Sequence, residues 1–401
     1  MNDKVYWIWL QQVLGISTSI RTDEIVAYFG NAKALYHAGE YEWRISGVFN
    51  PRQISKLNNQ DLTKAKNIFD SCVKNNWQTV TPDDENYPSM LFRLPNFPLV
   101  LYVNGDLDCL KNKITVAIVG TREPTRNSAC IARALSASIT RSGGLIVSGG
   151  ALGIDAASHD GALDAKGRTV AVLGCGLNKN YPAANSALRQ QISKNGAVIT
   201  EYPPETAPLA ANFPTRNRII SGLSYGTVII EAGEKSGSLI TANFALEQGR
   251  DVFAVPGDIV SSGFTGTNRL IREGAKPVFN AMDILEEYAV RYPELIDIQQ
   301  IEKTLTLKTY ADPPSRAKAD DNPPRQTKGK VEFIKQVEPP LLSENARKIY
   351  RAFDSGEMQT EELILKTGLD VSTFYSAMTE LELFDLVELQ AGKNYKLKQD
   401  D

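Results

Sequence analysis

The sequence predicts an α/β fold: a Rossmann-like, doubly wound and mostly parallel sheet, with a small helical domain before it and a winged helix after it. Three observations support this prediction. Short, continuously apolar runs alternate with amphipathic stretches in the middle of the chain, residues 1–80 show helical periodicity, and a helix-rich segment with two short strands closes the sequence. Strands that are apolar throughout are typical of a parallel sheet covered by helices on both faces.

The middle of the chain, residues 81–290, supplies the predicted sheet. Strands alternating with helices indicate βαβ units, in which successive strands run parallel. The expected strands are 116–119, 145–147, 170–173, 197–199, 228–230, 252–255 and 277–279, and the expected helices are 127–141, 154–165, 185–194, 214–223, 238–248 and 266–273.

The spacing of apolar residues in 1–80 predicts a small helical domain. Trp7, Leu10 and Val13 recur at helical spacing, and the turns Leu14-Gly15-Ile16 and Ser46-Gly47-Val48 each lie between helix candidates. Turns of this kind are typical of helix-hairpin-helix and SAM-like modules. A plain helical packing module is the favoured explanation of these turns, because a glycine followed by an apolar residue is common at helix ends.

The composition and periodicity at the end of the chain predict a linker over residues 291–341 and a winged helix over residues 342–401. Three proline pairs lie among Lys, Asp, Gln and Ser in the linker. Helices at 343–353, 360–367 and 371–380, followed by strands at 386–389 and 395–397, give the order of a winged helix. Its expected recognition helix, VSTFYSAMTELE, contains no Lys or Arg, so protein docking is favoured over DNA reading.

The composition excludes several classes of protein. The 401 residues include 44 Lys and Arg against 47 Asp and Glu, a net charge of −3, so nucleic acid could bind only at a local basic patch. Four scattered cysteines and two histidines argue against a disulfide framework and a His-rich metal centre. With no export leader and no run of about 18 apolar residues, we expect a cytoplasmic protein without a membrane segment.

Candidate binding residues follow the predicted strands, because ligands of an open parallel sheet bind where the strands end. Gly120, Thr121 and Arg122 follow the first strand of the domain and resemble a phosphate cradle. The next loop contains Gly149 and Gly153, which allow the backbone to approach a ligand closely. A tight strand-to-helix turn without a ligand is the alternative for both loops.

Two further stretches favour an anionic ligand. NFPTRNR places Arg216 and Arg218 in the first turns of a helix, where the helix dipole alone would favour acidic residues. Ser236, Gly237 and Ser238 follow a buried strand and open a helix, either as a second phosphate site or as a simple N-cap.

Standard cofactor and catalytic motifs are missing from the sequence. Neither G-x-G-x-x-G nor G-x-x-x-x-G-K-[ST] occurs, which disfavours dinucleotide and NTP sites of the usual kinds. The segment Gly222–Gly226 matches a nucleophile elbow but runs from a helix into a strand, the reverse of the required context. We therefore expect no catalytic residue, no cofactor and no metal.

Several ordered motifs resemble one family. IVGTR, SGGALGIDAASHDGAL, TVAVLGCGLNKNYP, TEYPP, NFPTRNRIISGLS, VIIEAGEKSGSLITANFALEQGRDVFAVPG and GTNRLIREGA closely resemble the DprA/Smf DNA-processing family. The resemblance implies a non-catalytic protein that binds and protects single-stranded DNA and forms a homodimer through its Rossmann-like domain. It also implies loading of the RecA recombinase onto incoming DNA during natural transformation.

The resemblance also implies particular DNA contacts. Leu152 and Ala183 depart from the family pattern, since both positions are often basic, and Arg126 is a candidate replacement for one of them. The family contacts map to Gly120, Thr121, Arg122, Gly149, Gly153, Arg216 and Arg218, and we add Ser236, Gly237 and Ser238 from their position after a strand.

Two other functions remain open. The same superfold includes phosphoribohydrolases that act on nucleoside monophosphates, with Glu231 as the acidic residue to test here. Those enzymes use a PGGxGTxxE motif, whereas the corresponding strand of this chain continues into EAGEKSGSLITA. A transcription factor acting through the winged helix is disfavoured by the lack of basic residues in its recognition helix.

Overall fold

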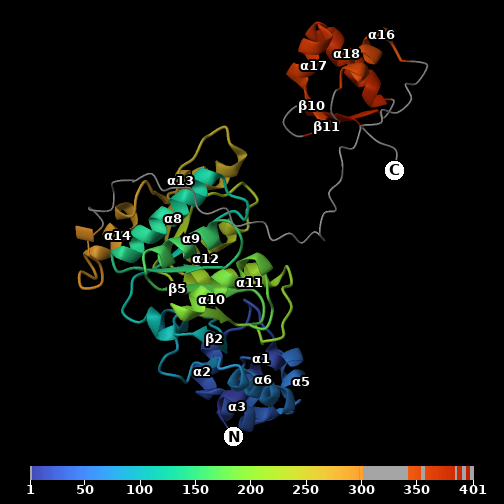
Figure 1. The fold of residues 1–401 in the computed structure, drawn as a ribbon. Coiled ribbons are helices and arrows are strands. Elements are labelled where there is room, and N and C mark those ends of the chain that lie inside the picture. The colour runs from blue at the N-terminus through green and yellow to red at the C-terminus, as the bar shows by residue number, and fades with distance from the viewer. Residues whose placement is uncertain are drawn as a thin grey trace. The chain divides into compact units, whose positions relative to one another are not determined.

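A computed structural model describes residues 2–297, 299–300, 342–353, 357–383, 386–390 and 394–397. The chain divides into two compact units, one within residues 1–319 and one within residues 320–401 (Figure 1). Most of the linker predicted at 291–341 lies outside the described residues, as does the turn 391–393 of the predicted hairpin.

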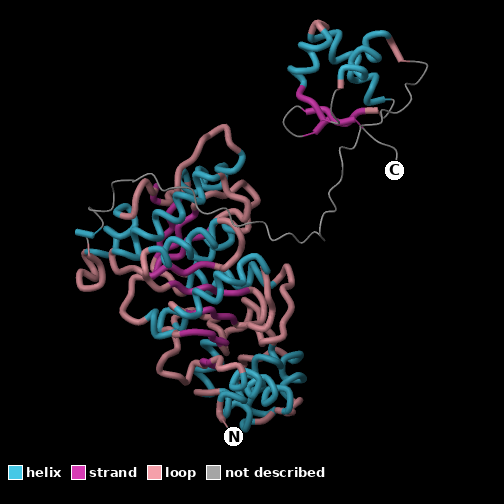
Figure 2. The backbone as a smooth tube through the Cα atoms, in the orientation of Figure 1, coloured by secondary structure: helices cyan, strands magenta, loops and turns pink. Residues whose placement is uncertain are grey.

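A nine-stranded sheet runs through the larger unit, with helices packed around it (Figure 2). Its strand order is β1-β2-β6-β5-β4-β3-β7-β8-β9, and all neighbours are parallel except β1–β2 and β2–β6. The mostly parallel sheet predicted from the sequence is confirmed. The strands are β1 (Gln78–Val80), β2 (Leu101–Gly105), β3 (Thr115–Val119), β4 (Leu145–Ser148), β5 (Thr169–Leu173), β6 (Ala197–Thr200), β7 (Gly226–Ile229), β8 (Asp251–Ala254) and β9 (Lys276–Pro277).

The two faces of the sheet are buried in separate apolar clusters. In β3, Val116 and Ile118 belong to one cluster, and Ala117 and Val119 belong to the other. This alternation explains why the central strands are apolar throughout. The covering helices begin and end within two residues of their predicted bounds where a prediction was made: α7 (Ser89–Phe92), α8 (Arg126–Arg141), α9 (Ile154–Asp164), α10 (Ser186–Lys194), α11 (Asn212–Gly222), α12 (Ser238–Glu247), α13 (Thr265–Arg272) and α14 (Met282–Ala289).

The strand predicted at 277–279 is shifted, because β9 ends at Pro277. The backbone N–H of Phe279 donates to the Asp283 carboxylate at 2.7 Å, and that of Asn280 donates to the same oxygen at 2.9 Å. These two bonds bend the chain toward α14. Phe279 is therefore outside the ladder and is 74% exposed.

Helices precede the sheet, as predicted for the first part of the chain. They are α1 (Lys4–Leu14), α2 (Thr22–Phe29), α3 (Ala32–Ala38), α4 (Glu40–Ile45), α5 (Pro51–Leu57) and α6 (Thr63–Lys74). The sequence did not predict β1, which occupies the end of the segment assigned to helices, or β2.

Strand β2 joins the helical segment to the sheet through its two faces. Leu101 and Val103 pack in a cluster of the sheet, while Tyr102 packs with the helices α1–α6. Tyr102 also donates a hydrogen bond from its hydroxyl to the side-chain oxygen of Gln11 in α1, at 2.9 Å. Successive residues of a strand point to opposite sides, so β2 contributes to both cores.

The smaller unit confirms the predicted winged helix. Its helices are α16 (Glu344–Ala352), α17 (Thr360–Thr367) and α18 (Val371–Leu383), and its strands are β10 (Glu357–Gln359), β11 (Val387–Gln390) and β12 (Asn394–Leu397). The strands form an antiparallel sheet in the order β10-β12-β11, of which β10 was not predicted. Among the helices described in either unit, none is long and apolar enough to cross a bilayer.

Candidate functional site

A crevice opens where the strand order of the large sheet reverses. From β3, the chain places β4, β5 and β6 on one side and β7, β8 and β9 on the other. Such a reversal is where open α/β sheets bind ligands, beyond the carboxyl ends of the strands. A cavity of about 420 Å³ lies there, and its wall includes seven of the predicted residues: Gly120, Thr121, Arg122, Arg216, Ser236, Gly237 and Ser238.

The loop that follows β3 is hydrogen-bonded to the loop that follows β7. The N–H of Thr121 donates to the carbonyl of Glu231 at 2.9 Å. The Glu231 carboxylate accepts from the backbone N–H and the hydroxyl of Thr125, at 2.9 and 3.0 Å. The side chain of Glu231 is buried, so it positions the loop that carries Arg122.

Gly153 acts through packing and does not line the cavity. It has a φ of 76°, and an added Cβ would lie 2.5 Å from the carbonyl oxygens of both Thr121 and Arg122. Only glycine combines that backbone conformation with so close an approach. The glycine predicted as a ligand contact instead lets α9 begin directly against the Thr121–Arg122 backbone.

Arg122 is exposed at the rim of the crevice and lies over an aromatic ring. Its guanidinium carbon is 5.3 Å from the centroid of Phe213, and that of Arg216 is 5.8 Å from the same ring. Tyr181 lies 5.6 Å from Phe213, ring to ring, and is partly exposed. Our sequence reasoning missed Phe213, although it precedes the arginines in NFPTRNR and an aromatic beside arginines is a signal for nucleic-acid binding.

Arg216 lines the crevice but is almost fully buried. Its Nη1 donates to the carbonyl of Gly149 at 2.5 Å and also to that of Val172. Burial lowers the pKa of the Arg216 guanidinium, while the nearby Asp155 carboxylate opposes that shift. Burial likewise raises the pKa of Asp155, against the effect of Arg216. Asp155, which the sequence reasoning also missed, therefore compensates the buried positive charge of Arg216 beside the loop that follows β4.

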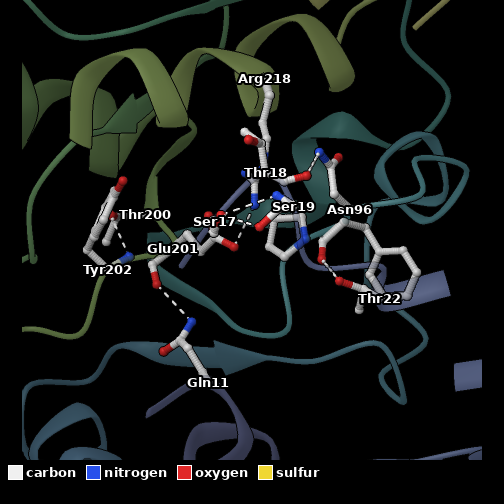
Figure 3. A network of polar contacts seen from close by, with 12 residues as sticks. Gln11, Ser17, Thr18, Ser19, Thr22, Asn96, Thr200, Glu201, Tyr202 and Arg218 are labelled. Carbon is white, nitrogen blue, oxygen red and sulfur yellow. Dashed lines mark hydrogen bonds and ion pairs between the residues drawn. The ribbon is translucent and has the colours of Figure 1, made fainter. Parts of the chain in front are cut away.

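The structure does not bring Arg218 to the crevice. Its side chain is 2% exposed and forms an ion pair with Glu201 at 2.8 Å (Figure 3). Residues two apart on an α-helix are separated by about 200° around the axis, so Arg216 and Arg218 cannot face the same side. This geometry corrects the expectation of a DNA contact at Arg218, since its anionic partner is a carboxylate of the same chain.

A smaller cavity of about 60 Å³ adjoins the crevice and shares Arg122 and Phe213 with it. Gly149 and Leu152 line this cavity, together with Tyr181. Leu152 is 43% exposed, so an apolar side chain is accessible at this cavity. Ala183 is exposed in the short helix 183–185, and Arg126, the first residue of α8, is not among the described residues that line either cavity.

The sequence matches a known family over both units. Residues 78–289 match the sequence model of the family described as DNA recombination-mediator protein A, and residues 335–393 match that of the DprA winged helix domain. The chain belongs to the DNA recombination-mediator protein A (DprA/Smf) family. The family predicted from the ordered motifs is thereby confirmed.

Relatives of this family resemble the chain in sequence and in fold. Protein Smf of Synechocystis sp. is 33% identical over 98% of this chain and 99% of its own length. The DNA processing protein DprA of Bacillus subtilis is 44% identical over 53% of this chain and 72% of its own length. The X-ray structure of DprA from Streptococcus pneumoniae has a TM-score of 0.62 and 35% identity, covering 72% of this chain and 98% of that chain.

Proposed function

We propose that the crevice between β3 and β7 binds single-stranded DNA and that the protein acts as a recombination mediator without catalysing a reaction. The observation that carries this proposal is the exposed Arg122 over Phe213, at the point where the strand order reverses. Membership of a family of DNA recombination mediators supports DNA as the ligand.

The chemistry of the crevice favours a single strand over a duplex. Proteins that bind single strands combine cationic groups for the backbone with aromatic faces on which unpaired bases stack. Arg122 provides an accessible cation, Phe213 and Tyr181 provide rings, and the hydroxyls and amides at Ser236–Ser238 open α12 toward the same cavity. A base paired inside a duplex could not offer its face to these rings.

The role of Glu231 supports a binding protein over a phosphoribohydrolase. Both hydrogen bonds from Thr125 end on its carboxylate, and the residue does not line the crevice. A second acid, Asp155, lies at the cavity wall beside Arg216 and is engaged by the N–H of Ala151 at 3.3 Å. We therefore assign positioning roles to both acids.

We further propose that the protein works in the cytoplasm as a homodimer and loads RecA onto the strand it holds. Exposed apolar side chains near the β8–β9 edge of the sheet support a dimer through the Rossmann-like domain. Ile259 and Val260 after β8 are 88% and 86% exposed, and Phe279 follows the edge strand β9. Large exposed apolar groups of this kind are typical of protein interfaces.

The proposal is tested by fluorescence anisotropy with labelled single-stranded and double-stranded oligonucleotides over a series of salt concentrations. We expect tighter binding to the single strand, with affinity that falls as salt rises, because phosphate contacts release counterions. Equal affinity for both forms would contradict the assignment.

A second measurement separates binding from catalysis. Incubation with nucleoside monophosphates should release no ribose 5-phosphate. Release that is lost in Glu231→Gln, with the thermal stability retained, would support the enzyme instead. RecA loading is measured as the rate at which RecA displaces single-strand binding protein with and without this protein.

A further inference from the structure

A second, larger groove lies between the helical segment and the sheet. Its volume is about 680 Å³. One wall is the end of α1 with the turn Gly15–Ile16 and the exposed side of α6, and the other is the loop Tyr202–Thr206 that follows β6. Both walls belong to the same compact unit, so the groove is part of one body.

The groove is held open by buried polar contacts at its base. The side-chain amide of Gln11 donates to the carbonyl of Glu201 at 2.9 Å, while Arg218 binds the Glu201 carboxylate (Figure 3). Tyr202 fixes the other wall, because its hydroxyl donates to the carbonyl of Asn212 at 3.1 Å. The Gln11–Glu201 bond therefore ties the helical wall to the sheet wall at the base of the groove.

The groove continues the crevice along the chain. Asn212, the first residue of α11, lines the groove, and the next two residues, Phe213 and Pro214, line the crevice. The start of α11 is thus the common border of both cavities. The two cavities are therefore neighbours at this point of the fold.

The groove wall offers groups that suit a nucleic-acid strand. Gln12, Asn67 and Ser71 supply uncharged hydrogen-bonding side chains. Lys64 supplies an exposed positive charge that forms no ion pair with another described residue. The acid at the mouth, Glu205, is already bound by Lys179 at 2.7 Å.

The turn after α1 leaves its backbone accessible from the groove. Gly15 has a φ of 80°, and an added Cβ there would meet no atom within 4 Å. A ligand can therefore approach the main chain of this turn, which the sequence singled out as a possible helix-hairpin-helix element.

We propose that this groove binds the continuation of the DNA strand held in the crevice, with Lys64 placed for a phosphate and the amides of Gln12 and Asn67 for bases or sugar. The helical segment then lengthens the DNA site. This inference rests on the proposed single-strand binding, and the experiment is chosen so that the two can fail separately.

The test compares two oligothymidines, of about 4 and about 16 nucleotides, the range of site sizes seen in single-strand binding domains. In the full chain, Lys64→Glu should weaken binding of the long oligonucleotide about tenfold, the loss expected for one charge-assisted contact, and leave the short one unchanged. Asn67→Lys should strengthen binding of the long oligonucleotide only and steepen its salt slope by about 0.7. The matched control is Lys66→Glu, an exposed lysine of α6 that does not line the groove.

The gain expected for Asn67→Lys keeps the test independent of folding, since a misfolded variant would lose affinity. Unchanged binding of the long oligonucleotide in both groove variants, while Arg122→Ala weakens both lengths, would overturn the groove and leave the crevice intact. An equal loss in Lys64→Glu and Lys66→Glu would also overturn it, because only general charge would then matter. If the unaltered protein bound neither the short nor the long oligonucleotide, both proposals would be overturned.

Discussion

Replacing Arg122 by alanine is the most direct perturbation of the proposed DNA site. The side chain is exposed, is not required by any buried network, and contributes a guanidinium over Phe213 at 5.3 Å. A charge-assisted hydrogen bond to an ionised group contributes about 1.5–3 kcal/mol, and partial exposure places Arg122 at the lower end. At about 1.4 kcal/mol per tenfold change, Arg122→Ala should weaken single-strand binding by about 10- to 30-fold.

The salt dependence provides a second, independent readout for the same variant. Each neutralised phosphate of a single strand contributes about 0.7 to the slope of log affinity against log salt concentration, so Arg122→Ala should reduce that slope by about this amount. Anisotropy titrations at several salt concentrations measure both quantities. Arg52→Ala, an exposed arginine in α5 that lines neither cavity of the site, is the control. Unaltered affinity and slope for Arg122→Ala would show that the DNA lies elsewhere on the protein.

Three further predictions concern residues near the site or in the core. Arg218→Ala should lower the free energy of unfolding by about 3–5 kcal/mol in a denaturant titration, because it leaves the Glu201 carboxylate buried without its cation. A loss under about 1 kcal/mol, the usual value for an ion pair on the surface, would be inconsistent with a buried pair. Gly153→Ala should lower the free energy of unfolding by about 1–3 kcal/mol and also weaken DNA binding, since the added Cβ would push against the backbone of Thr121 and Arg122. Unchanged DNA binding together with unchanged thermal unfolding would contradict the packing role of Gly153. At about pH 8, a thiol reagent should label Cys130 first and Cys72, Cys109 and Cys175 only on unfolding. Burial raises the pKa of these three thiols, that of Cys109 to about 12, and so reduces the fraction of reactive thiolate. Early labelling of Cys109, detected by mass spectrometry, would refute this prediction.

The strand-end loops could be predicted from the sequence because a parallel sheet brings them together regardless of the distance between them in the chain. Arg122 and Ser236–Ser238 meet in the crevice for this reason. The side of α11 that each arginine faces was also available from helical geometry, and applying it would have separated Arg216 from Arg218. The identity of the partner was not available, because Glu201 reaches Arg218 only after β6 and α11 have packed together.

The edge of the sheet was harder to predict. Strand β1 has three residues, too few for a clear alternation, and β2 lies in an apolar stretch beside a proline-rich connector. Their antiparallel pairing with each other and with β6 depends on contacts between distant segments. Similarly, Glu231 was singled out as an acid, but its bonds to Thr125 depend on how two loops pack.

The two-sided packing of β2 has a practical consequence for shortening the protein. A chain cut before residue 81, where the helical segment was expected to end, would lose β1 and leave the edge of β2 unpaired, with Tyr102 stripped of the helices that cover it. An unpaired strand edge beside an exposed aromatic side chain can pair with a second copy of the chain. We therefore expect a chain shortened in this way to self-associate, and a soluble shortened form would need replacements for strand β1 and for the helices that cover Tyr102.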